Sequence, residues 1–285
     1  MDKDFGLVLE GGAMRSVFST GVLDCFLDEN IIFPNIMTLS AGAYAAAGYV
    51  SGKKNWVYDA IINPLKEYKY LGPSVFFKKG TFFDMDYLFD VVPKTVAPLD
   101  FEAFCQSAVR YIISTVNCVT AETVYHEKFD NLEHLLRTCK ASSSLPFIAR
   151  VSMLGGEPML DGGMDQAIPI AKAIEEGWKK VVIILSRDSS YRKAKQHPLY
   201  LAAVKAVYHK YPEFYKLVKS RPERYNESLE QVIALEKEGR ALIIRPEELT
   251  LKNSESDPEV LKTYHRHGYD VAKKRIDEIK AFLQM

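Results

Sequence analysis

The sequence predicts an α/β fold with a mainly parallel central sheet, helices on both faces and a helical C-terminal region. Through the first 190 residues, apolar segments of strand length alternate with segments of helical spacing. The β-branched runs at residues 111–116 and 181–185 are too short for helices and suit buried parallel strands. With 47% hydrophobic and 26% charged residues, the 285-residue chain can bury a substantial core.

The first elements follow in chain order. Residues 5–9 predict a short apolar strand, and a glycine-rich turn leads from it into a helix at residues 17–28. Residues 36–39 predict a second strand, and residues 41–50 predict a second helix that is rich in alanine. A later helix at residues 168–176 is expected to end at Gly177, since glycine tolerates the left-handed backbone that follows many helices.

The C-terminal third is predicted to be mainly helical. Asn226 is expected to cap a helix that ends at Gly239, and Asp257 with Pro258 is expected to start the last helix. Residues 242–244 predict one more strand. We therefore divide the chain into an α/β domain at residues 1–190 and a mainly helical region at residues 191–285, packed on the same domain.

Composition excludes several classes of protein. The formal net charge is zero, so nothing global indicates nucleic-acid binding. The first residues lack the basic and apolar regions of a signal peptide. The longest weakly polar run, at residues 36–50, is too short to cross a bilayer. The cysteines are widely spaced and predict reduced thiols in a cytoplasmic protein; they are Cys25, Cys105, Cys118 and Cys139.

Ser40 lies where the second predicted strand turns into the second helix, in the stretch Thr38-Leu39-Ser40-Ala41-Gly42. A serine at a sharp strand-to-helix turn is presented above the sheet edge, where it can act as a nucleophile. A serine at such a place can equally cap the helix. These residues by themselves leave both interpretations open.

A glycine-rich loop and an aspartate supply two further motifs. The loop reads EGGAMRS at residues 10–16, and its glycines let backbone N–H groups approach a phosphate or the oxyanion of acyl transfer. The dinucleotide fingerprint G-x-G-x-x-G fails at Ala13 and Ser16, so nucleotide binding is a weak alternative beside a purely structural turn. Asp161-Gly162-Gly163 is by itself only a turn signal.

Together the three motifs resemble those of the patatin-like phospholipase family, which carries G-G-G-x-R-G, G-x-S-x-G and D-G-G or D-G-A in this order. The counterparts here are residues 11–16, 38–42 and 161–163. A fourth similarity is ASSSLPF at residues 141–147, where the family has A-S-S-x-x-P. The blocks LSRDSSYRK and LEKEGRALIIRPEELT are similar to a bacterial branch, which extends the resemblance over the whole chain.

The resemblance implies a three-layer patatin-like fold and a serine-dependent lipid acyl hydrolase of the phospholipase or esterase type, active in lipid degradation. It implies that Ser40 is the nucleophile and that Asp161 is its general base, a catalytic dyad that works through an acyl-enzyme. It also implies that the oxyanion hole is the backbone of Gly11, Gly12 and Ala13. No cofactor and no metal are expected. Arg15 is expected to contact a phosphate or head group, or to anchor the loop through a salt bridge.

The sequence departs from the family pattern at Ala13, Ser16 and Thr38, each of which replaces a glycine. Ala13 is expected to fit if its φ is negative, and Ser16 is expected to cap the following helix. The β-branched Thr38 is expected to restrict the turn around Ser40. A catalytically impaired lipid- or acyl-binding protein on the same fold is therefore an alternative.

A Ser-His-Asp esterase is a second alternative, because several histidines follow Asp161 in the chain. None of them follows a convincing strand. These candidates are His197, His209, His265 and His267. His126 and His134 precede Asp161 and show no metal-ligand spacing.

Residues 55–89 hold ten aromatic residues and four lysines. This mixture suits a lid or cap over an acyl groove, or a bilayer interface, although packing inside the fold is the simpler interpretation. Residues 191–225 carry nine Lys/Arg against two Glu, a balance of +7, and are a second candidate for contact with anionic lipid. We expect a lipid or other acyl-ester substrate and peripheral contact with the inner membrane surface. The oligomeric state stays open.

Overall fold

The computed structural model describes residues 4–247 and 251–285. Eight strands in these ranges form one sheet, in which seven follow the order β5-β6-β3-β2-β1-β7-β8 and β4 pairs with β3. Neighbours among β1, β2, β3, β7 and β8 are parallel, whereas β4, β5 and β6 pair antiparallel. The strands are β1 (Phe5–Leu9), β2 (Asn35–Thr38), β3 (Arg110–Asn117), β4 (Thr123–His126), β5 (Ser152–Leu154), β6 (Glu157–Asp161), β7 (Lys180–Ile184) and β8 (Ala241–Ile244).

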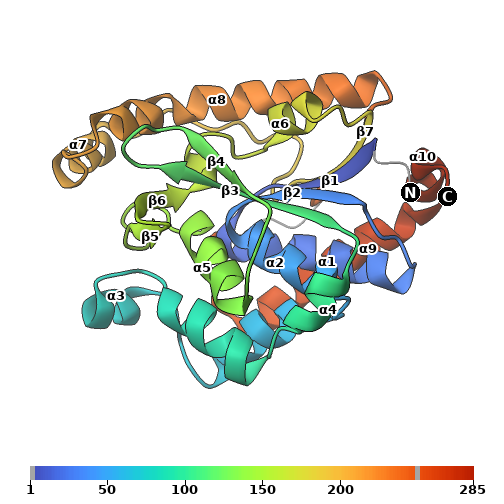
Figure 1. Cartoon of the computed structure of the whole chain (residues 1–285), viewed down its shortest axis with the longest axis horizontal. Coiled ribbons are helices and arrows are strands. Elements are labelled where there is room, and N and C mark those ends of the chain that lie inside the picture. Colours follow the sequence, from blue (N-terminus) through green and yellow to red (C-terminus); the bar gives the residue numbers. More distant parts are fainter. Residues whose placement is uncertain (1–3, 248–250) are drawn as a thin grey trace.

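Helices cover both faces of this sheet, which gives the three-layer α/β fold that the sequence predicts (Figure 1). On one face lie α6 and α8, and on the other lie α1, α2, α5 and α9. The α-helices are α1 (Val17–Asp28), α2 (Ser40–Val50), α3 (Pro73–Lys79), α4 (Phe101–Gln106), α5 (Leu132–Ser142), α6 (Ile170–Glu175), α7 (Pro198–Val207), α8 (Pro212–Lys237), α9 (Pro258–Lys274) and α10 (Ile276–Leu283).

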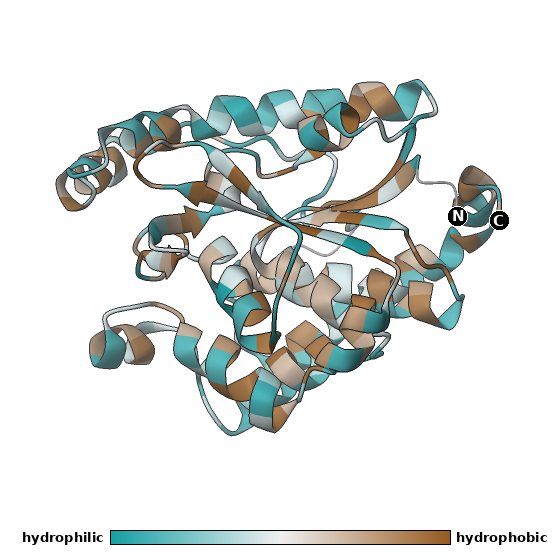
Figure 2. Ribbon diagram, in the orientation of Figure 1, coloured by the Kyte–Doolittle hydropathy of each residue, from teal (hydrophilic) through white to brown (hydrophobic). Residues whose placement is uncertain are grey.

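The alternation of side chains along β1 separates two apolar cores. Leu7 and Leu9 pack into the core beneath α1, α2 and α9, whereas Val8 points to the opposite core beneath α6 and α8. Every one of these three side chains is fully buried. Figure 2 shows hydrophilic residues over much of α8, the outermost helix on its face. The central strands are therefore buried on both sides, as the apolar runs in the sequence indicate.

Most element predictions hold to within one or two residues, but the prediction for Asn226 is wrong. Asn226 lies inside α8, which has already begun at Pro212. Its side chain is used for another contact: Oδ1 accepts the Lys193 N–H at 2.8 Å, and Nδ2 donates to the Lys193 carbonyl at 3.1 Å. Asp257 caps α9 as expected, although α9 is followed by the short α10.

The C-terminal region is tightly connected to the rest of the fold. Strand β8 extends the sheet by pairing with β7, and α9 crosses α1 at very short range. At this crossing a Cβ on Gly21 would lie 1.9 Å from the His265 carbonyl oxygen, and one on Gly268 would lie 2.0 Å from the Phe18 carbonyl oxygen. Only glycine fits at both positions. The division at residues 190 and 191 stays a prediction.

The aromatic residues of segment 55–89 have two different environments. Trp56, Tyr70 and Phe89 are buried in the core beneath the π-helices η2 (Tyr58–Ile62) and η4 (Tyr87–Val96). In contrast, Phe76 and Phe77 on α3 are 49% and 86% exposed. Most of these aromatics are thus structural, whereas the two rings on α3 and that of Tyr68, which is 38% exposed, face solvent. No helix in the described ranges has the length and apolar character needed to cross a membrane.

Candidate active site

Ser40 begins α2 directly after β2, at a sharp turn in the chain. Its φ is +55°, in the left-handed region that non-glycine residues rarely adopt and that costs about 1–3 kcal/mol. The neighbouring loop approaches so closely that a Cβ on Gly11 would lie 2.7 Å from the Ser40 Cβ. The strained turn and the glycine together present the Ser40 hydroxyl to a cavity instead of to the helix backbone, since no side-chain cap bond forms here.

The Ser40 hydroxyl donates a hydrogen bond to Asp161 Oδ2, with the two oxygens 2.7 Å apart. Asp161 ends β6, and its other oxygen, Oδ1, accepts the Gly163 N–H at 2.7 Å. Burial raises the pKa of Asp161 to about 6, although the Ser40 hydroxyl and the Arg221 charge both favour the ionised carboxylate. A carboxylate with this pKa is a better proton acceptor near neutral pH than an exposed aspartate.

Ser142, at the end of α5, fixes the backbone of the turn. The Ser40 N–H donates to Ser142 Oγ at 2.7 Å, and the Ser142 hydroxyl in turn donates to the Ser114 carbonyl on β3 at 2.7 Å. All three residues are buried. Ser142 therefore connects the Ser40 turn to the central sheet. The ASSSLPF stretch marked this segment, but sequence reasoning assigned no role to Ser142.

The glycine-rich loop supplies unused hydrogen-bond donors beside Ser40. In the described part of the chain, the N–H groups of Gly11, Gly12 and Ala13 donate to no protein acceptor. Ala13 has a φ of +49°, so the expectation of a negative φ at this position is wrong. The loop must turn sharply into η1 (Ala13–Ser16), and Ala13 accepts the left-handed backbone that a family glycine adopts without strain.

The two other departures from the family pattern are Thr38 and Ser16. Thr38 is fully buried, yet the Ser40 and Asp161 oxygens still meet at 2.7 Å. Ser16 precedes α1 but makes no capping hydrogen bond, contrary to expectation. The reason is that its backbone is already helical (φ −66°, ψ −7°) after η1, whereas a capping residue needs an extended backbone.

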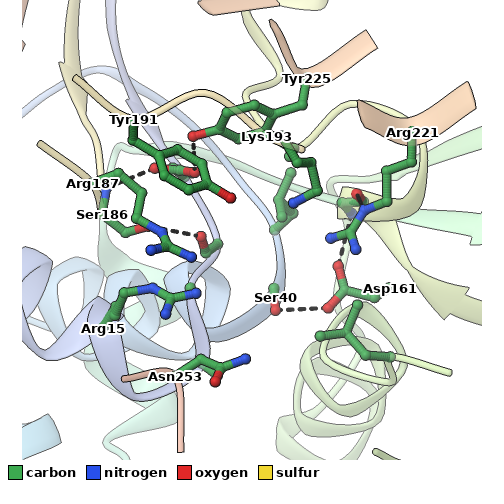
Figure 3. A pocket seen from close by; sticks show the side chains of 18 residues that line it. Arg15, Ser40, Asp161, Ser186, Arg187, Tyr191, Lys193, Arg221, Tyr225 and Asn253 are labelled. Carbon is green, nitrogen blue, oxygen red and sulfur yellow. Dashed lines mark hydrogen bonds between the residues drawn. The ribbon is translucent and has the colours of Figure 1, made fainter. Parts of the chain in front are cut away.

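Two cavities meet at Ser40, which lines both of them. The first, which we call the polar cavity, has a volume of about 200 Å³ and includes Arg15, Arg187, Lys193 and Arg221 among its lining residues (Figure 3). The second, the apolar cavity, has a volume of about 80 Å³ and is lined mainly by the side chains of Tyr44, Val57, Ile61, Phe83, Leu88 and Phe89. A molecule bound across Ser40 would place a charged group on one side and an apolar group on the other.

Arg15 is one of the cations in the polar cavity. Its guanidinium donates to the Leu251 carbonyl at 3.4 Å, and it pairs with no carboxylate in the described ranges. Burial, followed by the charge of Arg187, lowers the pKa of Arg15. The described residues thus offer no salt bridge through Arg15, which was one of its two expected roles.

The histidines do not take part in this site. No histidine lines the polar or the apolar cavity. His265 instead bonds Asp24 at 2.8 Å where α9 packs on α1, and His197 caps α7. A Ser-His-Asp arrangement at Ser40 therefore has no histidine available. The described residues also contain no cluster of three or more metal-ligating side chains.

Sequence reasoning missed the other three cations of the polar cavity. Arg187 follows β7, and Lys193 and Arg221 belong to the basic stretch at residues 191–225. That stretch indicated contact with an anion, but it could not show which of its nine basic side chains point inward. Glu10 was also unassigned: its carboxylate accepts the Ser186 N–H at 2.6 Å and the Tyr225 hydroxyl at 2.9 Å.

Comparison with models of known families shows to which family the chain belongs. A family model described as patatin-like phospholipase matches residues 7–174, which hold Ser40, Asp161 and the glycine-rich loop. The chain belongs to the patatin-like phospholipase family. A second model, described as a domain of unknown function (DUF6363), matches residues 211–284 and thus covers α8, β8, α9 and α10. Membership of the patatin-like family supports lipid acyl hydrolase activity in general.

Individual relatives add little functional detail. The chain is 28% identical over 185 residues to the uncharacterized protein YjjU of Escherichia coli K12, a match that covers 62% of this chain. It spans about half the length of that curated relative (50%). The solved structure of VipD from Legionella pneumophila aligns with 97% of this chain and 67% of its own, at 12% identity and a TM-score of 0.46.

Proposed function

We propose that this patatin-like protein is a serine-dependent acyl hydrolase that cleaves carboxylic esters of lipids through Ser40 and Asp161. The observation that carries this proposal is the 2.7 Å hydrogen bond from the Ser40 hydroxyl to the buried Asp161 carboxylate. Two features support it. The loop beside Ser40 holds N–H groups that donate to no acceptor among the described residues, and an apolar cavity opens on one side of the hydroxyl.

Acylation begins when Ser40 Oγ attacks the ester carbonyl carbon and its proton passes to Asp161 Oδ2. The carbonyl oxygen becomes an oxyanion, which accepts hydrogen bonds from N–H groups of the Gly11–Ala13 loop. When the tetrahedral intermediate collapses, the C–O bond to the alcohol breaks. The departing alkoxide takes the proton from Asp161, which leaves the acyl group on Ser40 and the aspartate ionised.

Deacylation repeats these steps with water. Asp161 accepts a proton from the water as its oxygen attacks the acyl carbonyl, and the same loop receives the oxyanion. Collapse breaks the bond to Ser40 Oγ, which recovers its proton from Asp161. The fatty acid is released and both residues return to their initial state. One carboxylate thus serves as base and acid in each half-reaction, and no histidine is needed.

Labelling with a fluorophosphonate probe tests this proposal directly. The wild-type protein is expected to be labelled, and Ser40→Ala is expected to abolish labelling because the attacking oxygen is gone. Ser228→Ala is the matched control: its hydroxyl donates to the Arg224 carbonyl on α8, outside both cavities, and labelling should persist. Absence of labelling in the folded wild-type protein would favour the alternative, a catalytically impaired lipid- or acyl-binding protein.

We also propose that α3 makes peripheral contact with a membrane surface. It presents the exposed rings of Phe76 and Phe77 beside Lys78, a combination that suits the boundary between acyl chains and anionic head groups. Replacing both rings by serine should reduce co-sedimentation with phosphatidylglycerol vesicles about tenfold or more. The control is Val260→Ser, an exposed apolar residue on α9. Equal binding of both variants would remove α3 from the contact.

A further inference from the structure

We propose that the polar cavity is a binding site for a phosphate monoester dianion, and that the ester substrate is accordingly a lipid whose head group ends in an unsubstituted phosphate. The assignment of the lipid rests on the proposed function, because it needs Ser40 to act on an ester. Binding of the phosphate group itself does not depend on that function.

The first argument is an excess of positive charge inside the cavity. Arg15, Arg187, Lys193 and Arg221 all line it and are all partly buried. None of the four pairs with a carboxylate in the described ranges, although ion pairs are common elsewhere on this protein. These four cations come from three separate segments and outnumber Glu10 and Asp161, the two carboxylates among the described lining residues, so a net repulsion remains between them. A dianion bound among them would offset this repulsion.

The lowered pKa of Lys193 is consistent with repulsion among these cations. Burial, followed by the charge of Arg221, lowers the pKa of Lys193 to about 7. The charge of Glu10 opposes this shift, whereas the charges of Arg187 and Arg15 act in the same direction as Arg221. A bound anion would favour the charged form of this ammonium group and would therefore be held more tightly by it.

The second argument separates an anionic head group from a zwitterionic one. The acidic residues that line the cavity are Glu10 and Asp161, and both carboxylates are already bonded on both oxygens. Among the described lining residues, no carboxylate is therefore free to hold a quaternary ammonium. Aromatic faces could do so, but Arg187 lies 4.1 Å from the Tyr191 ring and Lys193 lies 4.9 Å from the Tyr225 ring. Each of these two rings thus already has one of the protein's own cations over it.

The third argument concerns the positioning of the cations. The Asn226 side chain holds the backbone of Lys193 by accepting one hydrogen bond and donating another, and the Arg221 Nε donates to the Gly163 carbonyl at 2.7 Å. Gly163 also donates to Asp161, so Arg221 connects the cationic side of the cavity to the dyad. The Lys193 backbone and the Arg221 guanidinium therefore lose little freedom when an anion binds. The volume of about 200 Å³ suits a small head group, since drug-sized ligands need roughly 300–1,000 Å³.

Calorimetry with two head-group fragments tests the binding site without any hydrolysis. At pH 7, sn-glycerol 3-phosphate is expected to bind the wild-type protein at least about tenfold more tightly than sn-glycero-3-phosphocholine, since only the former is a dianion. Lys193→Gln is expected to weaken binding of glycerol 3-phosphate about tenfold or more. The matched control is Lys195→Gln, which removes the same charge two residues further along the chain at an exposed position, and it should change binding less than about twofold.

Arg187→Gln provides a second variant with the same expected loss of binding, in case Lys193→Gln does not fold. Equal affinity for the two fragments would overturn the proposal, and so would equal effects of Lys193→Gln and Lys195→Gln. No detectable binding of glycerol 3-phosphate to the folded wild-type protein would overturn it as well.

Hydrolysis distinguishes a lipid head group from free phosphate as the natural source of the anion. The protein is expected to cleave 1-acyl-glycerol 3-phosphate with a kcat/KM at least about tenfold higher than 1-acyl-glycerophosphocholine of the same chain length, and Lys193→Gln should remove most of this preference. Equal kcat/KM values with intact fluorophosphonate labelling would overturn the substrate assignment while the hydrolase function stands. Tight binding of glycerol 3-phosphate without labelling would support the phosphate site and overturn the hydrolase function instead.

Discussion

Asp161 links the burial of one carboxylate to the pH dependence of the proposed reaction. Because burial raises its pKa to about 6, a substantial fraction of the carboxyl is protonated below that pH and cannot accept the Ser40 proton. We expect kcat/KM for a neutral ester to rise with pH through about 6 and then level off. A pH–rate profile between pH 4.5 and 8 measures this. A rise centred near 4, the value for an exposed aspartate, would contradict the assigned role.

The same burial predicts opposite effects on activity and stability in Asp161→Asn. The folded pKa lies above the unfolded value of about 3.9, so the residue favours folding below pH 4 and loses that contribution as the pH rises through 6. At pH 8 the ionised carboxylate then costs up to about 3 kcal/mol. Asparagine removes this cost, so the variant should melt a few degrees higher at pH 8 but not at pH 4.

Asp161→Asn should at the same time lower kcat by about 10²–10⁴-fold, because no base remains. Thermal unfolding followed by circular dichroism at both pH values, together with ester turnover, checks the prediction. A variant that is less stable than wild type at pH 8 would show that the charge is not destabilising.

Ser142 is the residue whose removal should loosen the turn without touching the reacting atoms. In Ser142→Ala, the buried Ser40 N–H loses its acceptor, which costs about 1–3 kcal/mol of stability. Because Ser40 is then less firmly positioned, kcat should fall more than KM changes. Ser19→Ala is the control: its buried hydroxyl has no protein partner in the described ranges, so its loss should be neutral or stabilising. Equal effects of the two substitutions would contradict the positioning role.

Helices α1 and α9 cross where Gly21 and Gly268 face the backbone of the opposite helix. Replacing glycine by alanine inside a helix normally stabilises a protein by up to about 1 kcal/mol. Here alanine should destabilise the protein instead. A Cβ on Gly268 would lie 2.0 Å from the Phe18 carbonyl oxygen and must push the two helices apart. We expect Gly268→Ala to destabilise the protein by about 1–3 kcal/mol or more. Urea unfolding measures this, and a stabilised variant would contradict the close crossing.

At the scale of elements, the sequence predicts those strands, helices and site residues that short stretches of chain determine. Strands β1 and β7 and helix α1 follow from apolar periodicity, and Ser40 and Asp161 follow from short motifs at strand ends. The role of Asn226 does not follow from local pattern, because an asparagine that caps a helix and an asparagine inside a long helix look the same in the sequence. Its real partner, Lys193, lies 33 residues earlier in the chain. The positive φ of Ala13 is likewise set by the loop as a whole.

At the scale of the whole molecule, contacts run across the predicted boundary between residues 190 and 191. Strand β8 completes the sheet, α8 covers one face, and α9 packs on α1. A fragment of residues 1–190 would expose β7 as an edge and leave both apolar cores uncovered. We expect this fragment to unfold without a cooperative transition and to bind a hydrophobic dye. Calorimetry of the fragment against the full chain checks this, and a sharp transition in the fragment would contradict it.

The cations of the polar cavity show why the site is a property of the whole chain. Arg15 comes from the N-terminal loop, Arg187 follows β7, Lys193 precedes α7 and Arg221 lies on α8. Only the complete fold brings these segments together around Ser40 (Figure 3). A sequence pattern reports residues that are close along the chain, and for this reason it pointed to Ser40, Asp161 and the glycine-rich loop but not to the cavity beside them.

The junction of two unlike cavities at Ser40 has a kinetic consequence. Under the proposed mechanism, the acyl chain fills the apolar cavity, so the second substrate is expected to arrive through the polar cavity on the other side of Ser40. The leaving alcohol occupies that space until it departs. Alcohol release therefore precedes hydrolysis, and an added alcohol of suitable charge competes with water for the acyl group. The same protein would then act as an acyltransferase whenever such an acceptor is abundant.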